Sequence, residues 1–166
     1  MVGLARRVQL IEEKSKTLTT SSGILHAFKT DITKEEDVLS AFKWTEENVG
    51  PVSILINCAG VFKDPSLMSG KTEEYRRVID TNVTGLCVAT REAVKTMQTN
   101  KISGHIIHMN SYLGHVIPPS PGLSIYAASK FAVTALTETL RQELLAAKSK
   151  IKISVSVILL KSSKCV

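Results

Sequence analysis

Short runs of β-branched and other apolar residues alternate with longer segments of helical periodicity along the whole chain. Strands are expected over residues 1–5, 24–29, 53–56, 105–109 and 151–160. Between them, apolar residues recur three and four positions apart, which is the spacing of an amphipathic helix. Because strands that alternate with helices form parallel sheets with right-handed crossovers, the sequence predicts an α/β fold with a doubly wound parallel sheet. We expect a single domain over residues 1–166.

Polar residues ahead of the helical segments predict where the helices begin. Thr33 followed by Glu36 is a capping-box pattern, and Thr72 precedes a long helical pattern as its expected N-cap. Helices are expected over residues 8–19, 34–48, 73–99 and 124–148. The run 53–56, Ser-Ile-Leu-Ile, is almost continuously apolar, which is typical of strands buried on both faces of a parallel sheet.

The residues that follow the expected strands are polar or glycine. In open α/β sheets, ligands bind at the carboxyl ends of the strands. The residues in those positions are Arg6 and Arg7, Asp31, the turn Asn57-Cys58-Ala59-Gly60, and Asn110 with Ser111. We therefore expect four strand ends to converge on one polar rim, where a ligand would bind.

The segment that carries the most chemistry joins a strand end to a long helix. Ser111 lies at the strand end, and Tyr126 and Lys130 are four residues apart, which puts them on one helix face. A hydroxyl polarises a carbonyl, a phenol exchanges a proton, and an ammonium lowers the pKa of the phenol from its usual value of about 10. The alternative interpretation is a helix-start aromatic residue and a solvated lysine.

Metal sites and disulfides are not expected. The three cysteines, Cys58, Cys87 and Cys165, are far apart and form no CxxC pair. His105 and His108 are the closest histidines, and their separation puts them on opposite faces of a strand.

Composition and charge indicate an ordinary globular chain. Hydrophobic residues make up 43% and charged residues 22% of the sequence. No apolar run is long enough to span a membrane, and the N-terminus has no signal-peptide pattern, so we expect a cytoplasmic protein. The net charge of +6 is scattered, without a basic stripe interleaved with aromatic residues. We therefore expect no nucleic-acid partner.

With these residues, the chain resembles the short-chain dehydrogenase/reductase family. The shared motifs are Asn57-Cys58-Ala59-Gly60, Asp80-Thr81-Asn82-Val83, Ser111 and Tyr126-Ala-Ala-Ser-Lys130, in this order. The stretches 85–91 and 137–144 are most similar to the farnesol-dehydrogenase-like branch of the family.

The resemblance implies a Rossmann-like sheet and an oxidoreductase that uses NADP, with NAD as the alternative cofactor. The substrate would be a small-molecule alcohol or carbonyl, such as an isoprenoid or another lipophilic alcohol. The resemblance also implies a homodimer, built by the helices over 73–99 and 124–148.

The resemblance assigns a role to each residue of the Ser-Tyr-Lys-Asn set. Tyr126 would be the general acid or base, and Lys130 would lower its pKa and hydrogen-bond the nicotinamide ribose, so both would also contact the cofactor. Ser111 would hold and polarise the substrate oxygen. Asn82 would anchor a water relay behind Lys130. The alternative for Asn82 is a polar helix residue that mends a local kink.

A second set of residues would bind the rest of the cofactor: Asn57, Ala59, Gly60, Asp31, Arg6 and Arg7. Gly60 would let the backbone approach the cofactor, because glycine adds no side-chain bulk. Asp31 would contact the adenine. The arginines stand where an NAD-binding protein has an acidic residue, which favours the 2′-phosphate of NADP. The alternatives are an ordinary turn at 57–60, an Asx turn at Asp31 and two solvated arginines.

The chain departs from the family pattern at both ends, so we expect a truncated member. No glycine-rich turn precedes a helix, although the family uses such a turn to cradle the pyrophosphate. In the family, that first strand lies at the centre of the sheet, so its absence would leave two unpaired edges. Either the two halves pair directly, or the chain folds poorly. After residue 158, the Ser-Pro-Gly turn and substrate-covering segment of the family are also missing. The alternative function is therefore a catalytically silent chain that associates, if at all, through its helices.

Overall fold

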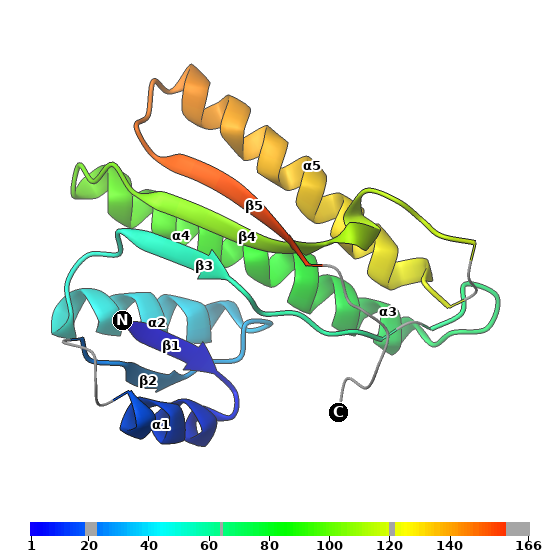
Figure 1. The fold of residues 1–166 in the computed structure, drawn as a ribbon, viewed down its shortest axis with the longest axis horizontal. Helices are drawn as coiled ribbons and strands as arrows, with labels where there is room; N and C mark the ends of the chain where they lie inside the picture. The colour runs from blue at the N-terminus through cyan, green and yellow to red at the C-terminus, as the bar shows by residue number, and fades with distance from the viewer. Residues whose placement is uncertain (19–22, 64, 120–121, 159–166) are drawn as a thin grey trace.

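The strands of the computed structural model, which describes residues 1–18, 23–63, 65–119 and 122–158, form two parallel sheets (Figure 1). In the first sheet, β1 (Val2–Ala5) pairs with β2 (His26–Lys29). In the second, β4 (His105–Ser111) lies between β3 (Ile54–Asn57) and β5 (Lys152–Ile158). The predicted α/β fold with parallel strands is confirmed.

Helices connect the strands in the predicted alternating order. They are α1 (Val8–Thr17), α2 (Glu35–Asn48), α3 (Thr72–Ile79), α4 (Gly85–Thr99) and α5 (Ser124–Ala146). A π-helical turn, Asp80–Thr84, joins α3 to α4, and a 3₁₀ turn, Tyr112–Gly114, follows β4. The predicted single helix over 73–99 is therefore wrong in one respect, because the π turn interrupts it.

The first sheet has a helix on each face. Trp44 of α2 packs against the rings of His26 and Phe28, at centroid distances of 5.7 and 5.4 Å. On the other face, a Cβ added to Gly3 would lie only 2.9 Å from a methyl group of Ile11 in α1. Since successive strand residues point to opposite faces, α1 and α2 cover opposite sides of this sheet. This is the doubly wound arrangement.

The two sheets are held together by helix packing and not by strand pairing. Within the described ranges, no ladder joins the β1–β2 sheet to the β3–β4–β5 sheet. Of the two alternatives expected from the sequence, direct pairing of the two halves therefore does not occur among the described residues. Instead, α2 packs against α4, and Val38 and Phe42 of α2 join a core cluster that contains Ala93 and Met97 of α4 and Ile106 of β4.

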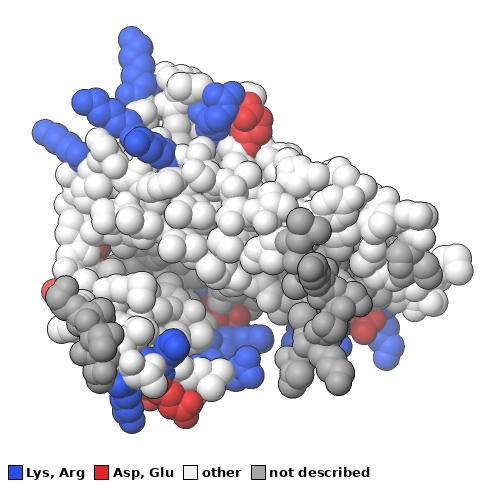
Figure 2. Space-filling model, viewed as in Figure 1, with Lys and Arg blue, Asp and Glu red and all other residues white. Residues whose placement is uncertain are grey.

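The second sheet is covered on one face only. Ile106 is fully buried in the core, whereas Ile54 and Ile56 of β3 expose 60% and 52% of their surface. The expectation that the run 53–56 is buried on both faces is therefore wrong, because the described segments leave one face open. Figure 2 shows the middle of this side of the molecule nearly free of charged side chains, with Lys and Arg gathered at its margins.

Two predicted helix caps differ in the structure. The N-cap of α2 is Lys34 and makes no side-chain cap hydrogen bond, so Thr33 does not cap this helix. The backbone N–H and hydroxyl of Thr33 instead donate to Oδ1 of Asp31, at 3.1 and 2.8 Å. Thr72 is the first residue of α3, and Lys71 occupies its N-cap. In both places a neighbouring residue took the position that the sequence pattern assigned to a threonine.

Candidate active site

All five strands point the same way, so their carboxyl ends lie on the same side of the two sheets (Figure 1). Arg6, Asp31, Asn57 and Ser111 stand at or just after the ends of β1, β2, β3 and β4. The residues of the predicted polar rim therefore stand at the same ends of their parallel strands. The contacts below show how its parts are connected.

The turn after β3 begins at a buried, hydrogen-bonded asparagine, and its other residues are exposed. Asn57 is 8% exposed, and its Nδ2 donates to Oγ1 of Thr90 on α4 at 3.0 Å. Cys58, Ala59 and Gly60 are exposed. A Cβ added to Gly60 would meet only Oδ1 of Asn82, at an ordinary 3.5 Å. The backbone of the turn is thus accessible to a ligand, which fits the expected approach of a cofactor.

The side chain of Asn82 hydrogen-bonds both to the segment after this turn and to α5. It is 2% exposed and lies in the π-helical turn. Its Oδ1 accepts from the N–H of Val61 at 2.8 Å, while its Nδ2 donates to the carbonyl of Val61 at 3.1 Å and to Oγ of Ser129 at 3.0 Å. These bonds link the turn after β3 to the helix that carries Tyr126, so Asn82 does more than mend its own helix.

Tyr126 and Lys130 are both buried, with 7% and 8% of their surfaces exposed. The Nζ of Lys130 lies 5.9 Å from the centroid of the Tyr126 ring and donates to the carbonyl of Met109 in β4 at 3.1 Å. Burial lowers the pKa of Lys130. The interpretation of Lys130 as a solvated surface lysine is therefore wrong, because its ammonium is held between α5 and β4.

Ser111, the last residue of β4, is buried and caps the short turn that follows it. It is 4% exposed, and its Oγ accepts from the N–H of Leu113 at 3.2 Å. The 3₁₀ turn that follows is tightly packed, because a Cβ added to Gly114 would lie 2.7 Å from the carbonyl of Lys130. The turn after Ser111 thus packs closely on α5, and Lys130 bonds to β4 two residues before Ser111.

Asp31 and the two arginines form the part of the rim next to β1 and β2. Arg6 and Arg7 are exposed. Partial burial opposes the shift, but the hydrogen bonds from Thr33 and the charges of Arg6 and Lys34 together lower the pKa of Asp31. The bonds to Thr33 are those of an Asx turn at a helix entry, which was the alternative considered for Asp31.

Two residues of the site, Phe62 and Ser129, are not predicted by the sequence motifs. Phe62 packs edge-on against the ring of Tyr126, with a centroid distance of 4.8 Å, and is itself 57% exposed. Ser129 donates to the carbonyl of Tyr126 at 2.6 Å and accepts from Asn82. The available signals were the position of Phe62 just after the 57–60 turn and the place of Ser129 directly before Lys130.

The sequence predicts neither a metal site nor a membrane-spanning helix. In the part of the chain that the structure describes, no three His, Cys, Asp or Glu side chains are grouped so that they could hold a metal ion. The same residues contain no helix with the length and apolar character needed to cross a membrane.

Comparison with known proteins identifies the family. A family model described as short chain dehydrogenase matches residues 1–161. Farnesol dehydrogenase of Aedes aegypti is 44% identical over 156 residues, which are 93% of this chain and 64% of that protein. Dehydrogenase/reductase SDR family member 11 of Bos taurus is 41% identical over 155 residues, which are 92% of this chain and 61% of that protein.

A solved structure gives the same answer. The short chain dehydrogenase/reductase from Burkholderia phymatum, crystallised in complex with NAD, superposes with a TM-score of 0.87 at 28% identity, over 95% of this chain and 56% of that chain. This chain spans less than two thirds of the length of the three relatives named here. The family match, the two sequence relatives and the shared fold agree, and the chain belongs to the short-chain dehydrogenase/reductase family.

Proposed function

We propose that this protein is an NADP-dependent oxidoreductase that interconverts an alcohol and a carbonyl through Ser111, Tyr126, Lys130 and Asn82. The observation that carries the proposal is the buried Lys130 ammonium, held 5.9 Å from the Tyr126 ring centroid at the end of the strand that carries Ser111. A buried cation beside a phenol favours the phenolate, which makes the phenol able to exchange a proton.

Tyr126 and Ser111 would act on the oxygen of the substrate. Lys130 and Asn82 would act on Tyr126 and on the helix that carries it. The hydroxyl of Tyr126 gives a proton to the oxygen during carbonyl reduction and takes it back during alcohol oxidation. The hydroxyl of Ser111 donates a hydrogen bond that polarises the same oxygen. Lys130 stabilises the phenolate, and Asn82 holds the Tyr126 helix against the turn after β3. A bound nicotinamide would supply or accept the hydride.

The residues of the rim fit a nicotinamide dinucleotide. The turn at Ala59 and Gly60 is exposed, so the cofactor can lie against its backbone, while Asn57 fixes where the turn begins. Asp31 would lie beside the adenine. Arg6 and Arg7 follow β1 and are exposed, and their charges suit the 2′-phosphate that distinguishes NADP from NAD.

A lipophilic alcohol is the proposed substrate class. Farnesol dehydrogenase of Aedes aegypti, the relative that is 44% identical, is named for an isoprenoid alcohol. Phe62 offers an exposed aromatic ring directly against Tyr126, where an apolar substrate would approach the phenol. Aromatic and aliphatic surface beside a single polar group is typical of pockets for apolar ligands.

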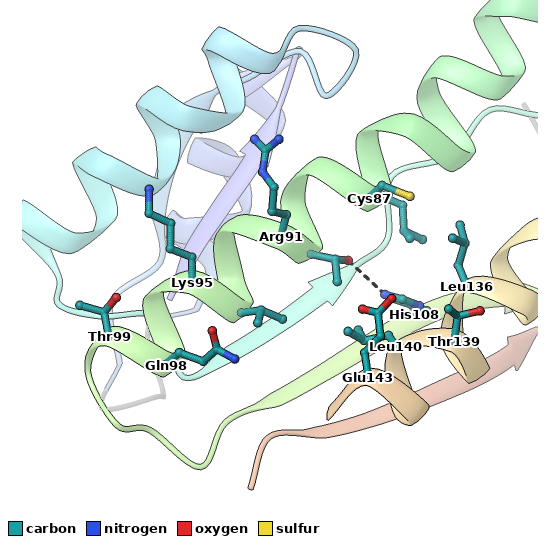
Figure 3. A pocket seen from close by; sticks show the side chains of 13 residues that line it. Cys87, Arg91, Lys95, Gln98, Thr99, His108, Leu136, Thr139, Leu140 and Glu143 are labelled. Atoms are coloured by element: carbon teal, nitrogen blue, oxygen red, sulfur yellow. Dashed lines mark hydrogen bonds between the residues drawn. The ribbon is translucent and has the colours of Figure 1, made fainter. Parts of the chain in front are cut away.

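We also propose one domain over residues 1–166 that forms a homodimer through α4 and α5. A groove of about 460 Å³ runs between these helices, and its lining combines charged and polar residues, such as Arg91 and Glu143, with apolar side chains (Figure 3). The apolar side chains are Leu86, Val94, Leu136 and Leu140. In a homodimer, the same helices of a second copy would bury these apolar side chains and leave the charged ones at the margin of the interface.

The second candidate function is a catalytically silent chain that associates through these helices. The observation that favours it is the division of the strands into two sheets, with exposed Ile54 and Ile56 in β3. Unpaired strand edges within a parallel sheet weaken the support of any site built on the strand ends.

Cofactor binding distinguishes the two functions. If the rim binds NADPH, titration of the purified chain should give a saturable rise in NADPH fluorescence that excess NADP reverses. Silent association predicts no saturation at millimolar cofactor, whereas a dimer mass by light scattering is expected for both functions. The first result supports the enzyme, and the second would replace it by the silent chain.

Replacing Arg6 and Arg7 should weaken the binding of NADPH much more than the binding of NADH. The double variant Arg6→Ala/Arg7→Ala is expected to weaken NADPH binding by about tenfold and NADH binding by less than about twofold, because only NADPH carries the 2′-phosphate. Fluorescence titration with each cofactor measures both affinities. The matched control is Lys14→Ala/Lys16→Ala, which removes the same charge from the exposed face of α1. Equal losses for both cofactors would contradict the assignment of the arginines.

A further inference from the structure

A chain of hydrogen bonds runs through the interior from the turn after β3 to α5. Nδ2 of Asn57 bonds to Oγ1 of Thr90 at 3.0 Å, and that oxygen lies 3.2 Å from Nε2 of His108. Nδ1 of His108 lies 2.9 Å from Oγ1 of Thr137, which donates to the carbonyl of Val133 at 2.7 Å. The chain thus connects β3, α4, β4 and α5.

His108 is the centre of this chain and is only 1% exposed. It lies at the base of the groove between α4 and α5, where the dashed line in Figure 3 ends on its ring. Thr90 lies in the stretch 85–91 that resembles one branch of the family, whereas His108 lies outside the motifs that carry the resemblance. A buried, fully bonded histidine beside a functional turn therefore needs its own explanation.

The direction of every bond in the chain follows from Thr137. Its single hydroxyl proton goes to the carbonyl of Val133, so its oxygen must accept from Nδ1–H of His108. A neutral ring protonated at Nδ1 has a lone pair on Nε2, which accepts the hydroxyl proton of Thr90. The oxygen of Thr90 is then free to accept from the amide of Asn57.

We propose that His108, as a neutral ring protonated at Nδ1, is a positioning residue that fixes Asn57 and the turn after β3 relative to α5. Thr137 lies seven residues after Lys130, which is about two helical turns along the same face. The chain of bonds therefore links the proposed cofactor-side turn to the helix that holds Tyr126 and Lys130. The consequence for cofactor binding rests on the proposed function, whereas the link between His108 and Asn57 does not.

Nuclear magnetic resonance of the full chain tests the link without any cofactor. Long-range ¹H–¹⁵N correlation at neutral pH should show His108 protonated at Nδ1 and unprotonated at Nε2, with its signals assigned from their loss in His108→Asn. A ring protonated at Nε2, or at both nitrogens, would overturn the proposal.

Breaking the chain on the α5 side tests whether Asn57 depends on it. Thr137→Val keeps the shape of the side chain but removes the hydroxyl, and it should speed hydrogen exchange of the Asn57 side-chain amide by about tenfold. The control is Thr139→Val in the same helix and groove, since Thr139 donates to the carbonyl of Ala135 and lies outside the chain of bonds. Exchange at Asn57 that is equal in the two variants would overturn the proposal.

Cofactor affinity separates this proposal from the function on which part of it rests. Thr137→Val should weaken NADPH binding by about fivefold, with Thr139→Val unchanged. If the original chain binds no NADPH while the exchange result holds, the proposed function fails and the positioning link stands. If NADPH binds but Asn57 exchange is unaffected by Thr137→Val, the positioning link fails and the function stands.

Discussion

Replacement of Tyr126 by phenylalanine is expected to lower turnover of a lipophilic alcohol or its carbonyl by about 10²- to 10⁴-fold. The variant keeps the ring that packs against Phe62 and loses only the hydroxyl that we propose exchanges the proton. NADPH affinity should change far less than turnover, because most proposed cofactor contacts lie on the turn after β3 and on the arginines. Absorbance of NADPH during turnover of farnesol measures the rate.

The matched control for this prediction is Tyr112→Phe. Tyr112 directly follows Ser111 but is 41% exposed, so loss of its hydroxyl should leave the rate unchanged. Circular dichroism of both variants checks that the fold is retained. Unchanged turnover in Tyr126→Phe would reject Tyr126 as the acid and base, and equal losses in both variants would show a general effect of removing a tyrosine hydroxyl.

The order of elements could be predicted from the sequence because strand and helix periodicities differ strongly. The π-helical turn at Asp80–Thr84 was missed, since five residues of π-helix barely alter the spacing of apolar positions around them. Thr33 was misread as a helix cap because Asp31, two residues earlier, offers an oxygen that competes for its N–H and hydroxyl. Local periodicity therefore predicts which helices and strands form. Competing side-chain hydrogen bonds shift the residues at which the helices begin.

Burial was harder to predict than secondary structure. The apolar run 53–56 indicates a strand, but apolarity alone cannot show whether a second layer covers each face. In the structure, Leu55 packs against the core while Ile54 and Ile56 stay exposed. The same limit applies to the gap between the two sheets, because the packing of α2 on α4 joins residues that are far apart in sequence.

The proposed site could be predicted as a set of residues but not as a connected structure. The Tyr126–Lys130 spacing on one helix predicts their proximity, and both are buried on α5. The bonds from Asn82 to Val61 and Ser129 cross 21 and 47 residues of sequence, respectively, so no local pattern announces them. The sequence offers His108 only as a candidate metal ligand, because its contacts with Thr90 and Thr137 depend on the packing of β4 between α4 and α5.

The second large expected effect is a dependence of stability on pH that comes from His108. Burial lowers the pKa of His108 to about 4 in the folded chain. A histidine in the unfolded chain has a pKa of about 6.5. Between these two values the unfolded chain binds more protons than the folded chain, so the free energy of unfolding falls as the pH falls. For a drop from pH 7 to pH 5, the expected loss is about 2 kcal/mol.

Urea unfolding at pH 7 and at pH 5 measures this loss, and His108→Asn should remove it. In this range most carboxylates keep their charge in both states, so the histidine dominates the difference. The charged side chains that face the His108 groove are Arg91, Lys95 and Glu143, and both ring nitrogens already bond to threonine hydroxyls. A proton added to Nε2 would point at the hydroxyl proton of Thr90, which opposes protonation further.

The control is His115→Asn. Because His115 is exposed, this variant should lose as much stability between pH 7 and pH 5 as the unaltered chain. If the free energy of unfolding of His108→Asn fell by as much between the two pH values as that of the unaltered chain, the loss would not come from His108. The neutral ring, and with it the direction of the bond between Nε2 and Thr90, would then be wrong.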